Sequence, residues 1–170
     1  MWIFQKLLNY PINSTCMKFT GKDGDVRGQR WNFQDNENLI SLFEIKKGFS
    51  RGGQYHENEV THILISGKIE YRKENVLTNK EEISTMDSFS SISLPPDTSD
   101  LITALEDSVM VGIYKNESEK KFYQKHSRIV KEKMESKKDH EHFVNDDPTE
   151  FPKEDMEDLA KKAIKKFKSL

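Results

Sequence analysis

The sequence predicts an antiparallel β-sandwich or β-barrel that ends in a charged helical extension. Between residues 30 and 115, short β-rich runs alternate with turn residues, and no helical pattern separates them. From Asn116 onward glycine disappears, and lysines nearly balance acidic residues. Connections this short favour antiparallel pairing, because parallel neighbours need long crossovers. We therefore expect a β-barrel over residues 30–115, an N-terminal strand or arm over 1–29 that packs on it, and a helical extension over 116–170.

The composition gives no reason to expect a nucleic-acid or anionic-membrane partner. The chain has 170 residues and a formal net charge of −2, with 34% hydrophobic and 33% charged residues. Such balanced charge does not attract a polyanion. The high charged content predicts either a small core or a segment outside the core, and the charge near the C-terminal end favours the second.

Three features of the sequence predict a cytoplasmic location. Cys16 is the single cysteine, so it cannot form an intrachain disulfide, which suits a reducing compartment. The first residues lack a basic segment followed by a long apolar run, so no signal peptide is expected. No apolar stretch approaches the roughly 20 residues of a membrane helix.

The N-terminal third contains two well-marked strands. Residues 2–19 lack a clean period and fit either an edge strand or a short helical turn. Residues 22–25 combine glycine with aspartates and predict a turn. Residues 30–33 alternate polar and aromatic side chains, as in a half-buried strand. After a polar turn at 35–38, residues 39–45 form a strand rich in apolar side chains.

The stretch richest in chemical groups follows a glycine pair, Gly52 and Gly53. A strand over residues 60–65 comes next, and period-2 alternation divides its side chains between two faces. One face carries Val60, His62 and Leu64, and the other carries Thr61, Ile63 and Ile65. A turn at Ser66 and Gly67 then leads into a strand with Ile69 and Tyr71.

The β-series ends near residue 115. Residues 83–92 form a weaker β-run with a turn at Asp87 and Ser88, and the prolines at 95 and 96 break the chain. Residues 101–105 and 108–114 are the last two predicted strands.

Two helices are expected after the β-series. Residues 117–138 predict a charged helix, and residues 139–150 a loop in which His140, Glu141 and His142 are solvated rather than metal-bound. Pro152 suits the first turn of a second helix, whose apolar stripe predicts docking on its own domain or on a second copy of the chain.

Two segments resemble the metal-binding motifs of the cupin superfamily. One begins at Gln54 and His56 and continues through a strand that ends in a Ser-Gly turn, and the other spans residues 87–105 around a proline turn. The resemblance implies an antiparallel jelly-roll barrel over residues 30–115 with a pocket in its mouth, and a homodimer. The usual ligand positions fall on Gln54, His56, Val60 and Asp100, so the motif is degenerate, although His62 shares a strand face with Val60.

A second resemblance within the same superfamily is to epimerases and ketoisomerases of nucleotide-linked deoxysugars. It rests on residues 25–28 and on Arg51, Gly52 and Tyr55. In those enzymes, which use no metal, the matching arginine holds the nucleotide diphosphate and a histidine is the base. Here the base position falls on Gln54, and His56 two residues later is the substitute.

The first interpretation of these residues is a metal centre. Gln54, His56, His62 and Asp100 offer the nitrogen and oxygen ligands that hold iron, manganese, nickel or zinc. The alternative is that His62 is a hydrogen-bonded core histidine and that Asp100 caps a turn.

The second interpretation is metal-free acid–base catalysis. His56 would take the proton, oriented by Asp100 or Tyr55, and Arg51 and Arg72 would bind phosphate oxygens. The alternative for Arg51 is a cross-strand ion pair with Glu44 or Glu70.

The third interpretation is a binding module without catalysis, whose pocket is lined by Gln54, His56, His62 and Tyr71. We favour this one: a small-molecule-binding cupin, acting on a carbohydrate or sugar-nucleotide derivative, with no cofactor or one divalent metal. The runner-up is a metal-dependent oxygenase or isomerase with a rebuilt ligand set.

Overall fold

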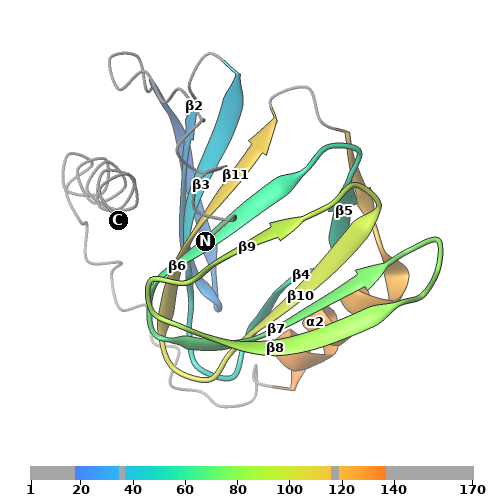
Figure 1. The fold of residues 1–170 in the computed structure, drawn as a ribbon. Coiled ribbons are helices and arrows are strands. Elements are labelled where there is room, and N and C mark those ends of the chain that lie inside the picture. The colour runs from blue at the N-terminus through green and yellow to red at the C-terminus, as the bar shows by residue number, and fades with distance from the viewer. Residues whose placement is uncertain (1–17, 35–36, 116–118, 137–170) are drawn as a thin grey trace.

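The computed structural model describes residues 18–34, 37–115 and 119–136, and it contains two packed β-sheets with one helix outside them (Figure 1). The strands are β1 (Lys18–Asp25), β2 (Gly28–Gln34), β3 (Asn38–Ile45), β4 (Ser50–Gly52), β5 (Gln54–His56), β6 (Val60–Ser66), β7 (Lys68–Asn75), β8 (Glu81–Asp87), β9 (Ser91–Leu94), β10 (Thr98–Ala104), β11 (Ser108–Lys115) and β12 (Lys120–Phe122). The helix is α2 (Gln124–Glu135). The predicted fold class, an antiparallel barrel with a helical C-terminal extension, is confirmed.

The strand order is that of a jelly roll. The larger sheet runs β1-β2-β3-β11-β6-β9 and the smaller one β4-β10-β7-β8, while β12 pairs with β5. Each pairing among the described strands is antiparallel. The late strands β10 and β11 each lie between earlier strands, so the chain crosses repeatedly from one sheet to the other.

The main core lies between the two sheets, and the alternation on β6 decides which side chains enter it. Val60 and Leu64 join a buried cluster with Tyr71 of β7 and Ile102 of β10. Ile63 points the other way and packs with a second cluster around Trp31 and other residues of β2, β3 and β11. The predicted division of this strand into two faces is confirmed.

Two local predictions were wrong. Residues 22–25 do not form a turn, because β1 continues to Asp25 and the chain reverses over the next two residues. The Asp25 carboxylate accepts a hydrogen bond of 2.9 Å from the backbone N–H of Arg27, which closes that reversal. The charged helix also begins later than predicted, since Lys120–Phe122 pairs with β5 before α2 starts at Gln124. A period-3.6 pattern does not exclude a three-residue strand at its start.

Helix α2 packs beside β4 and β10, below the smaller sheet in Figure 1. The Gly53 carbonyl accepts hydrogen bonds from the Tyr123 N–H at 2.9 Å and from Ser127 Oγ at 2.8 Å. Gly53 has φ of 81°, and a Cβ there would lie 2.8 Å from the Ser127 nitrogen, so only glycine fits this junction. Gly53 therefore allows the close contact between α2 and the barrel.

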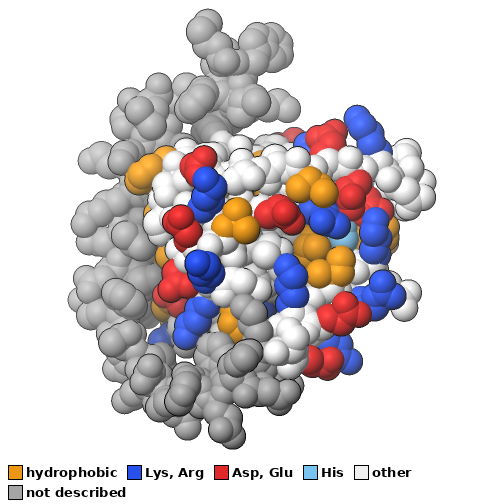
Figure 2. All heavy atoms as spheres, turned by 90° about the horizontal axis from the view of Figure 1, so that it is seen from below, with side chains coloured by type: hydrophobic (Ala, Val, Ile, Leu, Met, Phe, Trp, Pro, Cys, Tyr) orange, Lys and Arg blue, Asp and Glu red, His pale blue; other side chains and the backbone are white. Residues whose placement is uncertain are grey.

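The face seen from below mixes both signs of charge. Lysine, arginine, aspartate and glutamate side chains alternate over it, with small apolar areas between them (Figure 2). Within the described ranges no helix is long and apolar enough to cross a membrane. The predicted second helix, the loop at His140–His142 and most of the N-terminal arm lie outside the described residues, and the domain boundaries stay a prediction.

Candidate functional site

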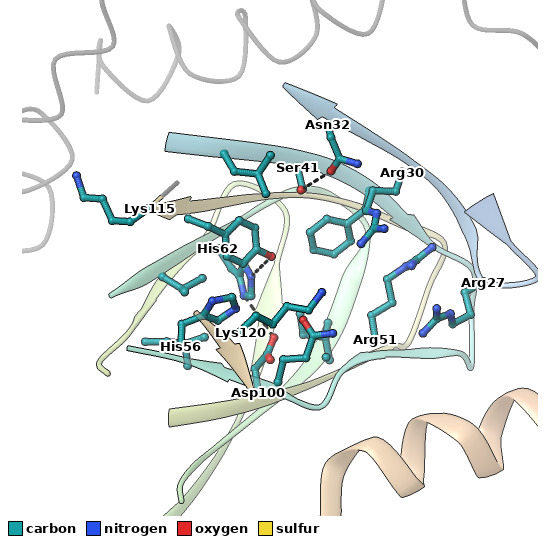
Figure 3. A pocket seen from close by; sticks show the side chains of 18 of the residues that line it. Arg27, Arg30, Asn32, Ser41, Arg51, His56, His62, Asp100, Lys115 and Lys120 are labelled. Atoms are coloured by element: carbon teal, nitrogen blue, oxygen red, sulfur yellow. Dashed lines mark hydrogen bonds and ion pairs between the residues drawn. The ribbon is translucent and has the colours of Figure 1, made fainter. Parts of the chain in front are cut away.

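A polar cavity of about 490 Å³ opens between the sheets. Its lining comes from β1 to β6, from β9 to β12 and from the β1–β2 turn. Arg27, Arg30 and Arg51 gather on one side of it, and His56, His62 and Asp100 lie on the other, with Lys120 beside His56 (Figure 3). The cavity is large enough for a small organic ligand.

Most of the residues predicted for the site meet in this cavity. Arg51, Gln54, His56, His62 and Asp100 all line it. They come from β4, β5, β6 and β10. Residues that are far apart in the sequence meet here because the chain crosses repeatedly between the two sheets.

Three predicted residues do not line the cavity. Tyr55 lies between Gln54 and His56 on β5, so period-2 alternation directs its side chain to the opposite face. Arg72 faces outward on β7 and ion-pairs with Glu81 at 3.6 Å. Tyr71 is fully buried behind the lining, where it contacts His62 instead of open space.

His62 is held at the centre of a buried hydrogen-bond network. Its Nδ1 lies 2.7 Å from the Tyr71 hydroxyl, and its Nε2 lies 3.1 Å from the Tyr114 hydroxyl. The Oδ2 atom of Asp100 is 3.6 Å from Nδ1. Burial and the charge of His56 lower the pKa of His62 to about 3. His62 is therefore a neutral imidazole at pH 7, with both ring nitrogens engaged.

Asp100 is an unusual carboxyl group for a protein interior. Its side chain is 9% exposed, and burial raises its pKa to about 7. The Asp100–His62 pair is therefore largely neutral at mildly acidic pH, because the interior disfavours two charges without full hydrogen bonding.

His56 is the histidine that faces open space in the cavity (Figure 3). Its ring centroid lies 5.2 Å from that of Tyr114, and its buried Nδ1 has no hydrogen-bond partner within the described part of the chain. Lys120 stands directly opposite on the paired strand β12. Burial and the Lys120 charge lower the pKa of His56. A neutral imidazole with a free nitrogen can accept a proton or a hydrogen bond from a ligand.

The sequence interpretation missed much of the basic side of the cavity. Arg27, Arg30 and Lys120 join Arg51 in the lining. Arg30 shares a strand face with Asn32 of the lining, opposite to the buried Trp31 and Phe33, so the alternation on β2 was a usable signal. Lys120 had none, because its segment was assigned to a helix.

Arg51 has a structural role besides its place in the lining. Its Nε donates to the carbonyl of Glu44 at 2.9 Å, and one terminal nitrogen donates to the carbonyl of Gly28 at 2.8 Å. The predicted alternative, an ion pair with the Glu44 carboxylate, is replaced by this contact with the Glu44 main chain. Burial and the nearby charge of Arg27 lower the pKa of Arg51 to about 10, so it stays cationic at pH 7.

Among the residues that the structure describes, the histidine and carboxylate side chains of the cavity do not form a compact metal-ligand set. His62 uses both nitrogens for tyrosine hydroxyls, and His56, His62 and Asp100 do not converge as Glu74, Glu81 and His126 do. The ligand atoms of those last three residues lie within 4.8 Å of one another, between α2 and the smaller sheet. The metal set predicted for the barrel stays a prediction, and this second cluster is the better-formed candidate among the described residues.

Comparison with known proteins supports the fold. No family model and no curated protein sequence match the chain. Among solved structures it is similar to the capsular polysaccharide assembling protein CapF from Staphylococcus aureus, at 20% identity and a TM-score of 0.51, over 68% of this chain and 34% of that one. It is also similar to oxalate decarboxylase from Bacillus subtilis, at 14% identity and a TM-score of 0.52, over 56% of this chain and 27% of that one.

The chain thus covers about a third or less of these neighbours' length, and it has a cupin superfamily fold. The resemblance predicted from the two sequence segments is confirmed at the level of the fold.

Proposed function

We propose that the barrel binds an anionic small molecule, a carbohydrate derivative that carries phosphate. One observation carries the proposal: basic side chains from separate elements, Arg27, Arg30, Arg51 and Lys120, line a single cavity. Guanidinium and ammonium groups bind phosphate oxygens through charge-assisted hydrogen bonds.

The rest of the lining suits a sugar. Asn32, Ser41 and Gln54 place amide and hydroxyl groups around the cavity, and Ser41 Oγ donates to Asn32 Oδ1 at 2.7 Å. Such groups both donate and accept, as sugar hydroxyls require. The likeness to a protein named for capsular polysaccharide assembly agrees with this choice of ligand class.

A thermal-shift panel tests the ligand class. The full chain is heated with glucose 1-phosphate, thymidine diphosphate, inorganic phosphate, glucose or thymidine. We expect the two phosphorylated organic compounds to raise the unfolding midpoint, because they bind the folded state alone. Glucose and thymidine lack the anion and should leave it unchanged. Equal shifts by neutral and anionic compounds, or no shift at all, would contradict the proposal.

A second candidate function is proton transfer by His56. It is favoured by the place of His56 in the cavity lining and by its Nδ1, which has no hydrogen-bond partner among the described residues. A neutral imidazole can remove a proton from the carbon next to a ketone, leaving the charge on the enolate oxygen, and can return it to the same carbon.

Deuterium incorporation tests that step. A nucleotide-linked 4-keto-deoxysugar in heavy water would gain carbon-bound deuterium with the natural chain and not with His56→Gln. Deuterium incorporation that persists in the variant would contradict proton transfer by His56. Absence of incorporation while the ligand binds would contradict it too, and ligand binding would remain as the proposed function.

A further inference from the structure

A second polar cluster lies where α2 meets the smaller sheet. Glu74 is near the end of β7, Glu81 opens β8, and His126 is in the first turn of α2. None of the three lines the barrel cavity. Their ligand atoms lie within 4.8 Å of one another, although the residues come from three elements.

His126 is the member that points to a ligand. Its side chain is fully buried, and its Nε2 makes no hydrogen bond to any residue that the structure describes. That atom lies 3.3 Å from Oε2 of Glu74. The other ring nitrogen, Nδ1, is 3.0 Å from Ser99 Oγ, a contact that fixes the orientation of the ring. Buried nitrogen atoms are rarely left without a hydrogen bond, so an Nε2 that lies 3.3 Å from a carboxylate oxygen without forming one needs an explanation.

We propose that Glu74, Glu81 and His126 bind a zinc ion in exchange for the ammonium group of Lys125. Zinc takes imidazole nitrogen and carboxylate oxygen at about 2.0–2.2 Å in tetrahedral geometry, which separates neighbouring ligand atoms by roughly 3.3–3.5 Å. The distance between His126 Nε2 and Glu74 Oε2 already has this value. A water molecule would complete the four ligands.

The two oxygen atoms of the Glu74 carboxylate have different partners, and one of them is placed to bind the ion. Oε1 accepts a hydrogen bond from the Tyr123 hydroxyl at 2.8 Å, while Oε2 faces both His126 and Lys125. Burial alone would raise the pKa of Glu74, but the hydrogen bonds from Lys125 and Tyr123 lower it overall.

Lys125 occupies the cation position in the structure. Its Nζ lies 2.7 Å from Glu74 Oε2 and 3.5 Å from Glu81 Oε1. The Lys125 side chain is 47% exposed, so it can move into solvent without breaking the core.

Zinc titration of substituted chains tests the exchange. The full chain is used with His140→Ala and His142→Ala, so that the tail histidines do not contribute, and zinc is partitioned against a chromophoric chelator. Lys125→Met keeps side-chain length and removes the competing charge. We expect it to bind one zinc at least about tenfold more tightly than the parent, because a unit charge at the ion's position is gone.

Two double variants, each built on Lys125→Met, show where the zinc ion binds. Adding His126→Gln or the partly exposed Glu81→Gln to Lys125→Met should weaken zinc binding at least about tenfold, while adding His56→Ala in the barrel should not. Zinc should also restore the unfolding midpoint that Lys125→Met loses, and circular dichroism checks that each variant is folded.

Three results would overturn the proposal. They are absence of zinc binding in Lys125→Met, binding that is unchanged in folded Lys125→Met with Glu81→Gln, and binding that depends on His56.

Discussion

Replacing Asp100 by asparagine should remove a large pH dependence from folding. In the folded chain burial raises the pKa of Asp100 to about 7, from an ordinary value of 3.8. Between these values the folded state holds a proton that the unfolded state has lost. Stability from this group is therefore lost as the pH rises toward 7. From pH 5 to pH 8 the loss spans about two pKa units at about 1.4 kcal/mol each, or about 3 kcal/mol.

His62 changes the free energy of unfolding with pH in the opposite direction, so its effect must be separated from that of Asp100. Its pKa is lowered to about 3 from 6.5, so its contribution is complete above pH 6.5 and is lost as the pH falls toward 3. Because His62 is present in both proteins, its contribution largely cancels in the difference between Asp100→Asn and the natural chain.

Urea denaturation at several pH values measures that difference. The free energy of unfolding of Asp100→Asn, relative to the natural chain, should rise by about 3 kcal/mol between pH 5 and pH 8. The matched control is Asp87→Asn, whose side chain is 76% exposed and whose curve should run parallel to that of the natural chain. Parallel curves for Asp100→Asn as well would refute the reasoning, since they would mean that Asp100 is ionised in the folded state.

Two further predictions concern the frame of the cavity. Arg51→Ala leaves the carbonyls of Glu44 and Gly28 without their charged donor and should lower the free energy of unfolding by about 2–4 kcal/mol, measured in urea. An unchanged midpoint would show that these bonds add nothing. Gly53→Ala should cost at least about 1 kcal/mol, because φ is 81° and the new Cβ would meet Ser127. In the same urea experiment Gly21→Ala, with nothing within 4 Å of its Cβ, should be near neutral, and equal losses in both variants would contradict the argument.

The fold was predictable because its signals are local. Alternation on residues 60–65 and the frequent turn residues identify antiparallel strands without any knowledge of their partners. The same alternation put His62 on the interior face with Val60 and Leu64. What failed was also local: a glycine between aspartates, at residues 23–25, lies inside β1 because its partner strand continues opposite.

The site was only partly predictable because its members meet through tertiary contacts. His56 and Asp100 were found through a motif resemblance and His62 through strand alternation, but nothing in the sequence shows that Tyr114 would engage the second nitrogen of His62. Lys120 reaches the cavity because a three-residue strand pairs with β5, and such a short strand has no periodicity to detect. The Glu74 cluster depends on where α2 docks, which local patterns do not specify.

The central claim is that the cavity binds a phosphate-bearing ligand, and a pair of adjacent lysines tests it most directly. Lys120 lines the cavity, whereas its neighbour Lys121 is not in the lining and pairs with Glu57 at 2.9 Å. Lys120→Gln and Lys121→Gln therefore change the net charge equally and differ only in which face they alter. The affinity for glucose 1-phosphate or thymidine diphosphate is measured by titration calorimetry at fixed ionic strength.

We predict that Lys120→Gln weakens binding of the responsive compound about 5- to 30-fold, a loss of about 1–2 kcal/mol, while Lys121→Gln leaves it within about twofold. Equal affinities in the two variants, or a larger loss in Lys121→Gln, would contradict the account.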